Sequence, residues 1–237
     1  MSVEVGLLGS LLPDRVGWAE AAVPDASADG AAVARIKTIE AGLFPEEREH
    51  IAHAVVKRRA EFAAVRHCAR QALRDIGFPP VPILPGEQRE PIWPEGVVGS
   101  MTHCAGYCAA AVARAGDVET LGIDAELHAP LPEGVLDLVS LETERERMAG
   151  LAAHASAEVH WDRVLFSAKE SVYKAWFPLT RLWLGFDEAD IDLRPDGSFT
   201  ARLQPATADP ATVPRGFVGR WAVSGELTAT AIGEVVR

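Results

Sequence analysis

The chain has 237 residues, of which 48% are hydrophobic and 24% charged, and its formal net charge is −11. Such a composition is that of a globular protein with an adequate core, folded as one large domain or two small ones. The acidic balance argues against a general role in binding nucleic acid or anionic membranes. No stretch reaches the roughly 20 apolar residues that a membrane span needs.

Two further features favour a cytoplasmic location. The first residues, Met1 to Val5, lack the basic start of a signal peptide. The three cysteines, Cys68, Cys104 and Cys108, do not form a framework of pairs, which fits a reducing compartment. We expect them to be packed as small hydrophobic side chains rather than to bind zinc, because no second Cys/His cluster with ligand spacing is present.

Local signals predict both helices and strands in the first half of the chain. Pro45 and two acidic residues mark a helix start, and Gly77 with two prolines marks a helix end. The expected elements are a strand at 3–8, a loop at 24–30, a helix from 45, a helix at 57–76, a loop at 79–95, and strands at 97–101 and 107–113.

Residues 114–119 are the predicted boundary between two halves. Beyond it we expect a strand at 121–126, acidic helices within 133–150, a helix at 158–177 ended by Pro178, and hairpins at 191–203 and 218–232. Because strands and helices are mixed without a β-α-β alternation, the sequence predicts an α+β fold rather than a doubly wound sheet.

One pair of segments carries the chemistry. Gly122-Ile123-Asp124-Ala125-Glu126 reads as a strand end, so Asp124 and Glu126 point to the same face. In the later segment, residues 166–174, helical spacing places Glu170 and Lys174 one turn apart on one face. Three converging carboxylates suit Mg²⁺ bound together with substrate phosphates, and a nearby lysine suits a leaving group that gains negative charge.

These segments resemble the signature of the Sfp/EntD-type 4′-phosphopantetheinyl transferases, and match it at every defined position. Further blocks at residues 57–70, 91–94 and 99–104 extend the resemblance over most of residues 45–190, closest to the PptT-like branch. The resemblance implies two similar α+β halves that pack as a pseudo-dimer and work as a monomer. Residues 1–115 would anchor coenzyme A, and residues 116–237 would carry the metal-binding and catalytic groups.

The resemblance also implies a reaction and its residues. The enzyme would transfer 4′-phosphopantetheine from coenzyme A to a serine of an apo acyl or peptidyl carrier protein, releasing adenosine 3′,5′-bisphosphate. Polyketide and nonribosomal peptide carriers are favoured. The implied metal ligands, for Mg²⁺ or Mn²⁺, are Asp124, Glu126 and Glu170; the implied catalytic residues are Glu170, Lys174 and Glu126; the implied coenzyme contacts are Arg58, Arg66, Ser100, Thr102, His103, Lys169 and Lys174.

Several residues receive a plainer interpretation. Arg70 and Arg74 are expected to form a solvated basic stripe, and Glu142, Glu144 and Glu146 are assigned no role. Pro85 stands where the PptT-like branch usually has a lysine that contacts the coenzyme, so coenzyme affinity should differ there unless Arg89 compensates.

Two other functions remain open at this point: a non-catalytic module that binds coenzyme A or a carrier protein, and a Mg²⁺-dependent hydrolase of coenzyme A. The intact Asp124, Glu126, Glu170 and Lys174 argue against the first. Release of the nucleotide without a carrier would indicate the second. Other phosphate chemistries fit less well, because the chain has neither a P-loop nor a Rossmann glycine motif.

Overall fold

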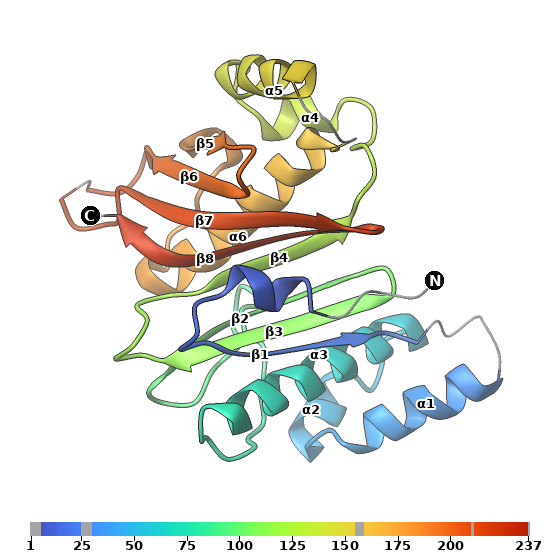
Figure 1. Ribbon diagram of the computed structural model, residues 1–237. Coiled ribbons are helices and arrows are strands. Elements are labelled where there is room, and N and C mark those ends of the chain that lie inside the picture. The colour runs from blue at the N-terminus through green and yellow to red at the C-terminus, as the bar shows by residue number, and fades with distance from the viewer. Residues whose placement is uncertain (1–5, 25–29, 155–158, 210, 237) are drawn as a thin grey trace.

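The computed structural model describes residues 6–24, 30–154, 159–209 and 211–236. Two antiparallel sheets are its framework, with strand orders β1-β3-β2 and β4-β8-β7-β6-β5. In Figure 1 the sheet from the N-terminal part of the chain lies below the other, with helices on its lower side. This mixture of separate helices and antiparallel strands confirms the predicted α+β class.

The first half contributes the smaller sheet and its helices. Its elements are η1 (Leu8–Leu11), β1 (Gly17–Ala22), α1 (Gly30–Ala41), α2 (Pro45–His50), α3 (Val56–Asp75), β2 (Val97–Cys104) and β3 (Tyr107–Arg114). The starts predicted at Pro45 and Val97 are confirmed, but β2 continues through Cys104, so His103 lies inside the strand. The strand predicted at 3–8 is wrong where it can be compared, because Leu8 begins a 3₁₀ helix; residues 3–5 lie outside the described ranges.

The second half contributes the larger sheet. Its elements are β4 (Gly122–Leu127), α4 (Val135–Val139), α5 (Glu142–His154), α6 (Trp161–Thr180), η2 (Phe186–Glu188), β5 (Ala189–Leu193), β6 (Ser198–Leu203), β7 (Gly216–Ser224) and β8 (Leu227–Val236). Both predicted hairpins are confirmed. The turn of the first places Gly197 at φ 83°, where a glycine carries no steric penalty.

Pro178 does not end α6, contrary to the prediction, because the helix continues to Thr180. Proline removes only one hydrogen bond there, in the last turn, and that turn is held in other ways. The Arg181 N–H donates to the Phe177 carbonyl at 2.8 Å, and Trp176 Nε1 donates to the Leu182 carbonyl at 2.9 Å. These two bonds hold the last turn of α6 although Pro178 has no backbone N–H to donate.

A long helix packs on each sheet through small residues. On α3, Ala69 and Ala72 are fully buried against the smaller sheet. A Cβ on Gly17 of β1 would lie 2.7 Å from the Ala72 carbonyl oxygen, so only glycine permits this approach. The helix α6 contacts β4 and β8 in the same manner in the other half.

One apolar layer is shared by both halves. It contains side chains from η1, β3, β4 and β8, and all of its buried members are at most 9% exposed. The neighbouring edges of β2 and β4 are linked by side chains: Ser100 Oγ accepts from the Ile123 N–H at 3.1 Å, and Thr102 Oγ1 accepts from the Ala125 N–H at 3.1 Å. We call this layer with its two hydroxyl links the shared interface.

Two charged residues that the sequence analysis set aside are buried. Arg70 is 6% exposed rather than solvated, and its Nη1 lies 3.0 Å from the buried Glu47. Glu144 is 1% exposed and pairs with Lys169 at 2.8 Å; it also accepts the Leu141 and Ile191 N–H groups. The prediction that Arg70 is solvated and Glu144 has no role is therefore wrong, because each meets a partner distant in sequence.

Candidate active site

The candidate site lies where β4 crosses α6. Cross-strand pairing and the burial pattern place Ile123 and Ala125 in the shared interface, so Asp124 and Glu126 face the helix. Gly122 lies on the same face, and a Cβ there would stand 2.0 Å from the Ser171 carbonyl oxygen. The glycine of the sequence motif therefore allows α6 to approach close enough for its side chains to reach Asp124.

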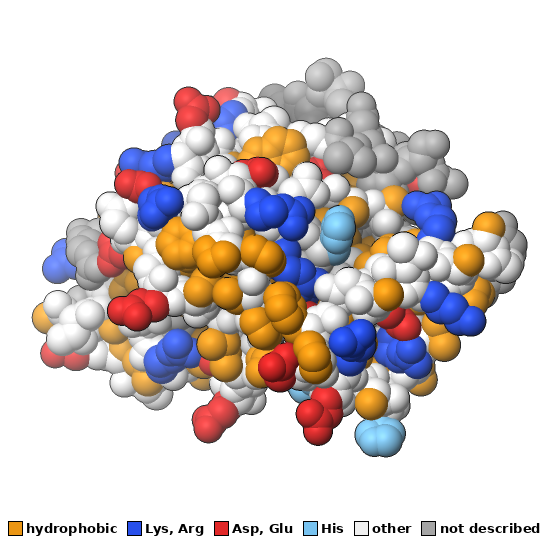
Figure 2. Space-filling model, turned by 90° about the horizontal axis from the view of Figure 1, so that it is seen from below, with side chains coloured by type: hydrophobic (Ala, Val, Ile, Leu, Met, Phe, Trp, Pro, Cys, Tyr) orange, Lys and Arg blue, Asp and Glu red, His pale blue; other side chains and the backbone are white. Residues whose placement is uncertain are grey.

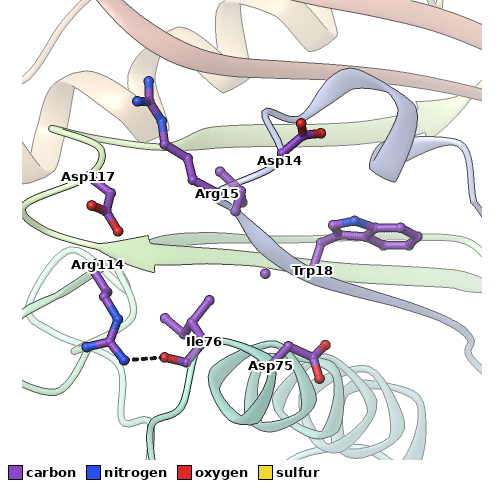
Figure 3. Close-up of a pocket in the computed structure, with 9 residues that line it drawn as sticks. Asp14, Arg15, Trp18, Asp75, Ile76, Arg114 and Asp117 are labelled. Atoms are coloured by element: carbon purple, nitrogen blue, oxygen red, sulfur yellow. Dashed lines mark hydrogen bonds between the residues drawn. The ribbon is translucent and has the colours of Figure 1, made fainter.

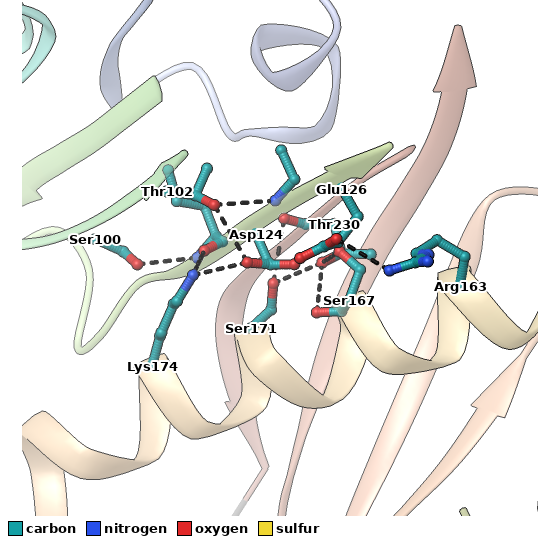
Figure 4. Close-up of polar contacts among 11 residues, drawn as sticks. Ser100, Thr102, Asp124, Glu126, Arg163, Ser167, Ser171, Lys174 and Thr230 are labelled. Carbon is teal, nitrogen blue, oxygen red and sulfur yellow. Dashed lines mark hydrogen bonds and ion pairs between the residues drawn. The ribbon is translucent and has the colours of Figure 1, made fainter. Parts of the chain in front are cut away.

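Asp124 is the centre of the cluster in Figure 4. The residue is 4% exposed; Oδ1 of its carboxylate lies 2.7 Å from Lys174 Nζ and accepts a hydrogen bond from Thr102 Oγ1 at 3.2 Å. Lys174 also donates to the Ile123 carbonyl at 3.1 Å. No donor among the described residues reaches Oδ2, which is buried. An orphaned carboxylate oxygen of this kind is what a cation would complete.

Glu126 and Glu170 complete the acidic group. Burial, and then the nearby Asp124, raise the pKa of Glu126 to about 7, although Arg163 at 3.2 Å acts in the other direction. Burial and Asp124 also raise the pKa of Glu170 above its ordinary value, while Lys174 opposes that shift. Three carboxylates that disfavour one another's charge fit a site for a divalent cation.

The carboxylates are not in a ready-made coordination cluster. Within the described residues, no group of three His, Cys, Asp or Glu side chains lies close enough to hold a metal ion. Instead, Asp124 is paired with Lys174 and Glu126 with Arg163. Both Glu126 and Glu170 lie near enough to Asp124 for its charge to act on them, so sharing a cation requires the three carboxylates to draw closer together.

A network of hydroxyls fixes α6 beneath Asp124. The Thr230 hydroxyl on β8 lies 2.6 Å from Ser171 Oγ and 3.0 Å from Ser167 Oγ, and all three side chains are buried. Because Thr230 is opposite Asp124 across the β4–β8 pair, this network sets the distance from the helix to the site. Neither Thr230 nor Arg163 was among the residues predicted from the sequence. Helical spacing from Glu170 puts Arg163 and Ser167 on the same face of α6, and that spacing is the signal that could have found Arg163.

Arg58 and His103 form a second polar group. Arg58 Nη1 lies 2.9 Å from His103 Nε2, and Glu61 is 3.8 Å from the other ring nitrogen. Arg58 is half exposed, with a side chain 50% accessible. Burial lowers the pKa of His103 below its ordinary value, and Arg58 adds to that shift while Glu61 opposes it. The two residues are brought together from α3 and β2, as an anion-binding pair would require.

The other expected coenzyme contacts have partners inside the protein. Arg66 is 4% exposed, donates from Nε to the Ile83 carbonyl at 2.8 Å, and lies over the Phe62 ring; burial lowers its pKa to about 9. Lys169 bonds the Phe186 carbonyl and Glu144, and burial lowers its pKa as well. Ser100 and Thr102 bind the β4 backbone. Contact of these four with coenzyme A stays a prediction, and the structure gives each another role.

A pocket of about 490 Å³ adjoins the cluster. Both halves contribute to it: Glu170, Tyr173 and Lys174 come from α6, while Ser100 and Arg89 come from the first half. Pro85 pairs with Pro91 in a small bridge at the base of the 86–90 turn. Arg89 lies in this turn, with a left-handed backbone at φ 67°, and lines the pocket. The turn therefore places a cation at the pocket wall.

Another pocket, of about 560 Å³, lies at the start of β1 beside the end of α3. Figure 3 shows its walls, including Asp14, Arg15 and Asp117, with Arg114 bonded to the Ile76 carbonyl. None of the residues predicted to act in the site lines it. The cluster at β4 and α6, with its adjoining pocket, is therefore the better candidate.

This arrangement defines a class of enzyme that handles phosphate groups: buried carboxylates, a lysine among them, and a cleft between two α+β halves. Two family models match the chain, the 4′-phosphopantetheinyl transferase N-terminal domain over residues 46–113 and the 4′-phosphopantetheinyl transferase superfamily over residues 120–223. Residues 114–119 lie between the two matched ranges, and a boundary between two halves at that segment stays a prediction.

Two similar proteins carry the same description, and a third carries a different name. The chain is 60% identical to 4′-phosphopantetheinyl transferase Svp of Streptomyces mobaraensis, over 80% of this chain and 78% of that protein. It is 50% identical to PptT of Mycobacterium tuberculosis, over 80% of this chain and 85% of that one. Enterobactin synthase component D of Salmonella typhi is 32% identical over 76% of this chain and 74% of that protein.

The chain therefore belongs to the 4′-phosphopantetheinyl transferase superfamily. Members of this family transfer phosphopantetheine from coenzyme A to carrier proteins, so the predicted family, enzyme class and reaction are confirmed. In the described part of the chain, no helix is both long and apolar enough to cross a membrane.

Proposed function

We propose that this transferase carries out its reaction at the β4–α6 cluster, with coenzyme A in the adjoining pocket. The single observation that supports this most strongly is Asp124, a buried carboxylate with one oxygen on Lys174 and the other without a donor among the residues that the structure describes. It stands at the wall between the two halves, next to a pocket of about 490 Å³ that both halves line.

Asp124, Glu126 and Glu170 would hold Mg²⁺ or Mn²⁺. The orphaned Oδ2 of Asp124 and the raised carboxyl pKa values of its two neighbours support this ligand set. When bound, the cation would neutralise charge on the pyrophosphate of the coenzyme. All three donors are hard oxygens, which suits these metals better than zinc.

Lys174 and Glu170 would take part in the chemistry itself. Both line the pocket, so both can reach a bound phosphate. Lys174 would stabilise or protonate the phosphate that leaves with the nucleotide, because its ammonium already lies among carboxylates and not in bulk water. Glu170, or a water held by Glu126, would accept the proton of the carrier serine, a role that their raised pKa values favour.

Arg58 and His103 would anchor the phosphate at the adenosine end. A half-exposed guanidinium beside an imidazole is suited to phosphate oxygens. The face in Figure 2 carries Lys and Arg side chains, with Asp and Glu between them, around a hydrophobic area, although the net charge is −11. Local basic groups of this kind would attract an anionic coenzyme to an acidic protein.

The partners would be apo acyl or peptidyl carrier proteins of polyketide and nonribosomal peptide synthesis, and the protein would act as a cytoplasmic monomer. The described cysteines are free, with Cys68 and Cys108 buried, which agrees with a reducing compartment. The shared interface already joins two halves within one chain, so a second copy is not needed to form the cleft.

Intact-protein mass spectrometry tests the site. Wild-type protein with coenzyme A, Mg²⁺ and an apo carrier should add one phosphopantetheine, and EDTA should prevent the gain. D124N should lose this activity, whereas D117N, at the wall of the other pocket, should keep it. A D124N protein that is as active as wild type would refute the site. Nucleotide released without a carrier would instead indicate a hydrolase, and coenzyme binding without transfer would indicate a binding module.

A further inference from the structure

Arg163 reaches from α6 to the segment that leaves β4, and each guanidinium nitrogen has a partner. Nη1 lies 3.2 Å from Glu126 Oε2, Nε donates to the Ala129 carbonyl at 3.0 Å, and Nη2 donates to the Pro130 carbonyl at 3.0 Å. Figure 4 shows the side chain pointing along α6 toward Glu126. The planar fork of an arginine, which spreads its N–H donors over three nitrogens, suits three such acceptors at once.

The same segment is tied to the start of α6 by further bonds. Asp162 Oδ2 accepts from the Leu131 N–H at 2.7 Å, and His128 Nε2 accepts from the His160 N–H at 3.0 Å. The His128 and His160 rings lie 4.7 Å apart. The chain just after Glu126 is therefore held against the helix that carries Glu170 and Lys174.

In the described part of the chain, the hydrogen-bonding partner seen at the Glu126 carboxylate is Arg163. Glu126 lies near the end of β4 with its side chain 26% accessible, and a glutamate held in one rotamer loses side-chain entropy. Because Arg163 already holds the Glu126 side chain in one rotamer, this entropy is lost before a ligand binds and does not weaken the binding. The bond from Arg163 is to Oε2, which leaves the other carboxylate oxygen, Oε1, for a ligand.

We propose that Arg163 is a positioning residue that holds Glu126 beside Asp124, in readiness to share a divalent cation. This inference rests on the metal site proposed above. Arg163 lies seven and eleven residues before Glu170 and Lys174, so all three occupy one face of α6. Arg163 contacts a ligand of the metal, not the substrate.

The experiment is Mn²⁺ binding followed by electron paramagnetic resonance, on intact protein without coenzyme or carrier. Loss of a group that orients a metal ligand typically costs about 10–100-fold in metal affinity, and we expect a loss of that size in R163Q. R163K keeps the charge but can reach fewer acceptors, so it should recover only part of the affinity. In turnover assays both variants should need more Mg²⁺, while KM for coenzyme A at saturating Mg²⁺ stays near the wild-type value.

R147Q is the matched control. Arg147 binds the Asp190 carboxylate and the Ile191 carbonyl in the same half, away from the site, so its loss should leave Mn²⁺ affinity unchanged. Wild-type Mn²⁺ affinity in both Arg163 variants, or an equal loss in R147Q, would overturn the inference. D124N separates the two proposals: if it binds Mn²⁺ as tightly as wild type, the metal site itself fails, whatever Arg163 does.

Discussion

Replacing Thr102 with valine tests whether its hydroxyl serves the shared interface or the coenzyme. The substitution keeps the shape of the side chain but removes two bonds, the one from the Ala125 N–H and the one to Asp124. Both partners are buried, at 1% and 4% exposure. A buried donor left without a partner costs about 1–3 kcal/mol, and the lost bond to a carboxylate adds to this.

We therefore expect T102V to lower the free energy of unfolding by about 2–4 kcal/mol. For a chain of this size, each kcal/mol lowers the melting temperature by about 2–4 °C. Urea unfolding followed by tryptophan fluorescence measures the first quantity, and thermal denaturation the second.

Thr228 provides the control. Its hydroxyl is fully buried and meets no partner among the described residues, so T228V should leave stability within about 0.5 kcal/mol or increase it. Equal effects of T102V and T228V would refute the reasoning. Unchanged stability in T102V with a raised KM for coenzyme A would instead show that the hydroxyl contacts the coenzyme.

Three other predictions concern the site. K174M should lower the rate of transfer about 10²–10³-fold with little change in coenzyme binding, because it removes charge stabilisation on the leaving phosphate; single-turnover kinetics would contradict this if only KM rose. G122A should unfold more easily by about 1–3 kcal/mol, because its Cβ would stand 2.0 Å from the Ser171 carbonyl oxygen; urea unfolding equal to wild type would show that α6 moves freely. His103 has a lowered pKa, so below about pH 6.5 the unfolded chain takes up its proton first and folding stability falls. H103Q should flatten that fall in urea titrations between pH 5 and 7.5, and an unchanged slope would contradict it.

The parts of the fold predicted from sequence are those with local signals. Pro45 at a helix start and Gly77 at a helix end marked α2 and α3 because they act on the residues beside them. The strand β1 was missed because Gly17–Ala22 is rich in alanine and shows no regular alternation of apolar and polar residues; its pairing with β3, some 90 residues away, makes it a strand.

The site divides in the same way. Strand periodicity placed Asp124 and Glu126 on one face, helix periodicity did the same for Glu170 and Lys174, and the structure brings the two faces together. Burial was harder to foresee. Nothing in the order of residues shows that Lys169 would meet Glu144, because that pair depends on how α5 packs near α6.

The shared interface also bears on what counts as a folding unit. Its buried side chains come from residues 7–16 and 107–125 and from 227–231, so a cut between the halves would expose apolar surface on both fragments. Expressed alone, neither fragment could cover that surface, and its association with the other would be driven by the same burial. The two halves are thus distinct as sheets, each with its own hydrogen-bond ladder, and because they share this buried layer we expect them to unfold as one cooperative unit.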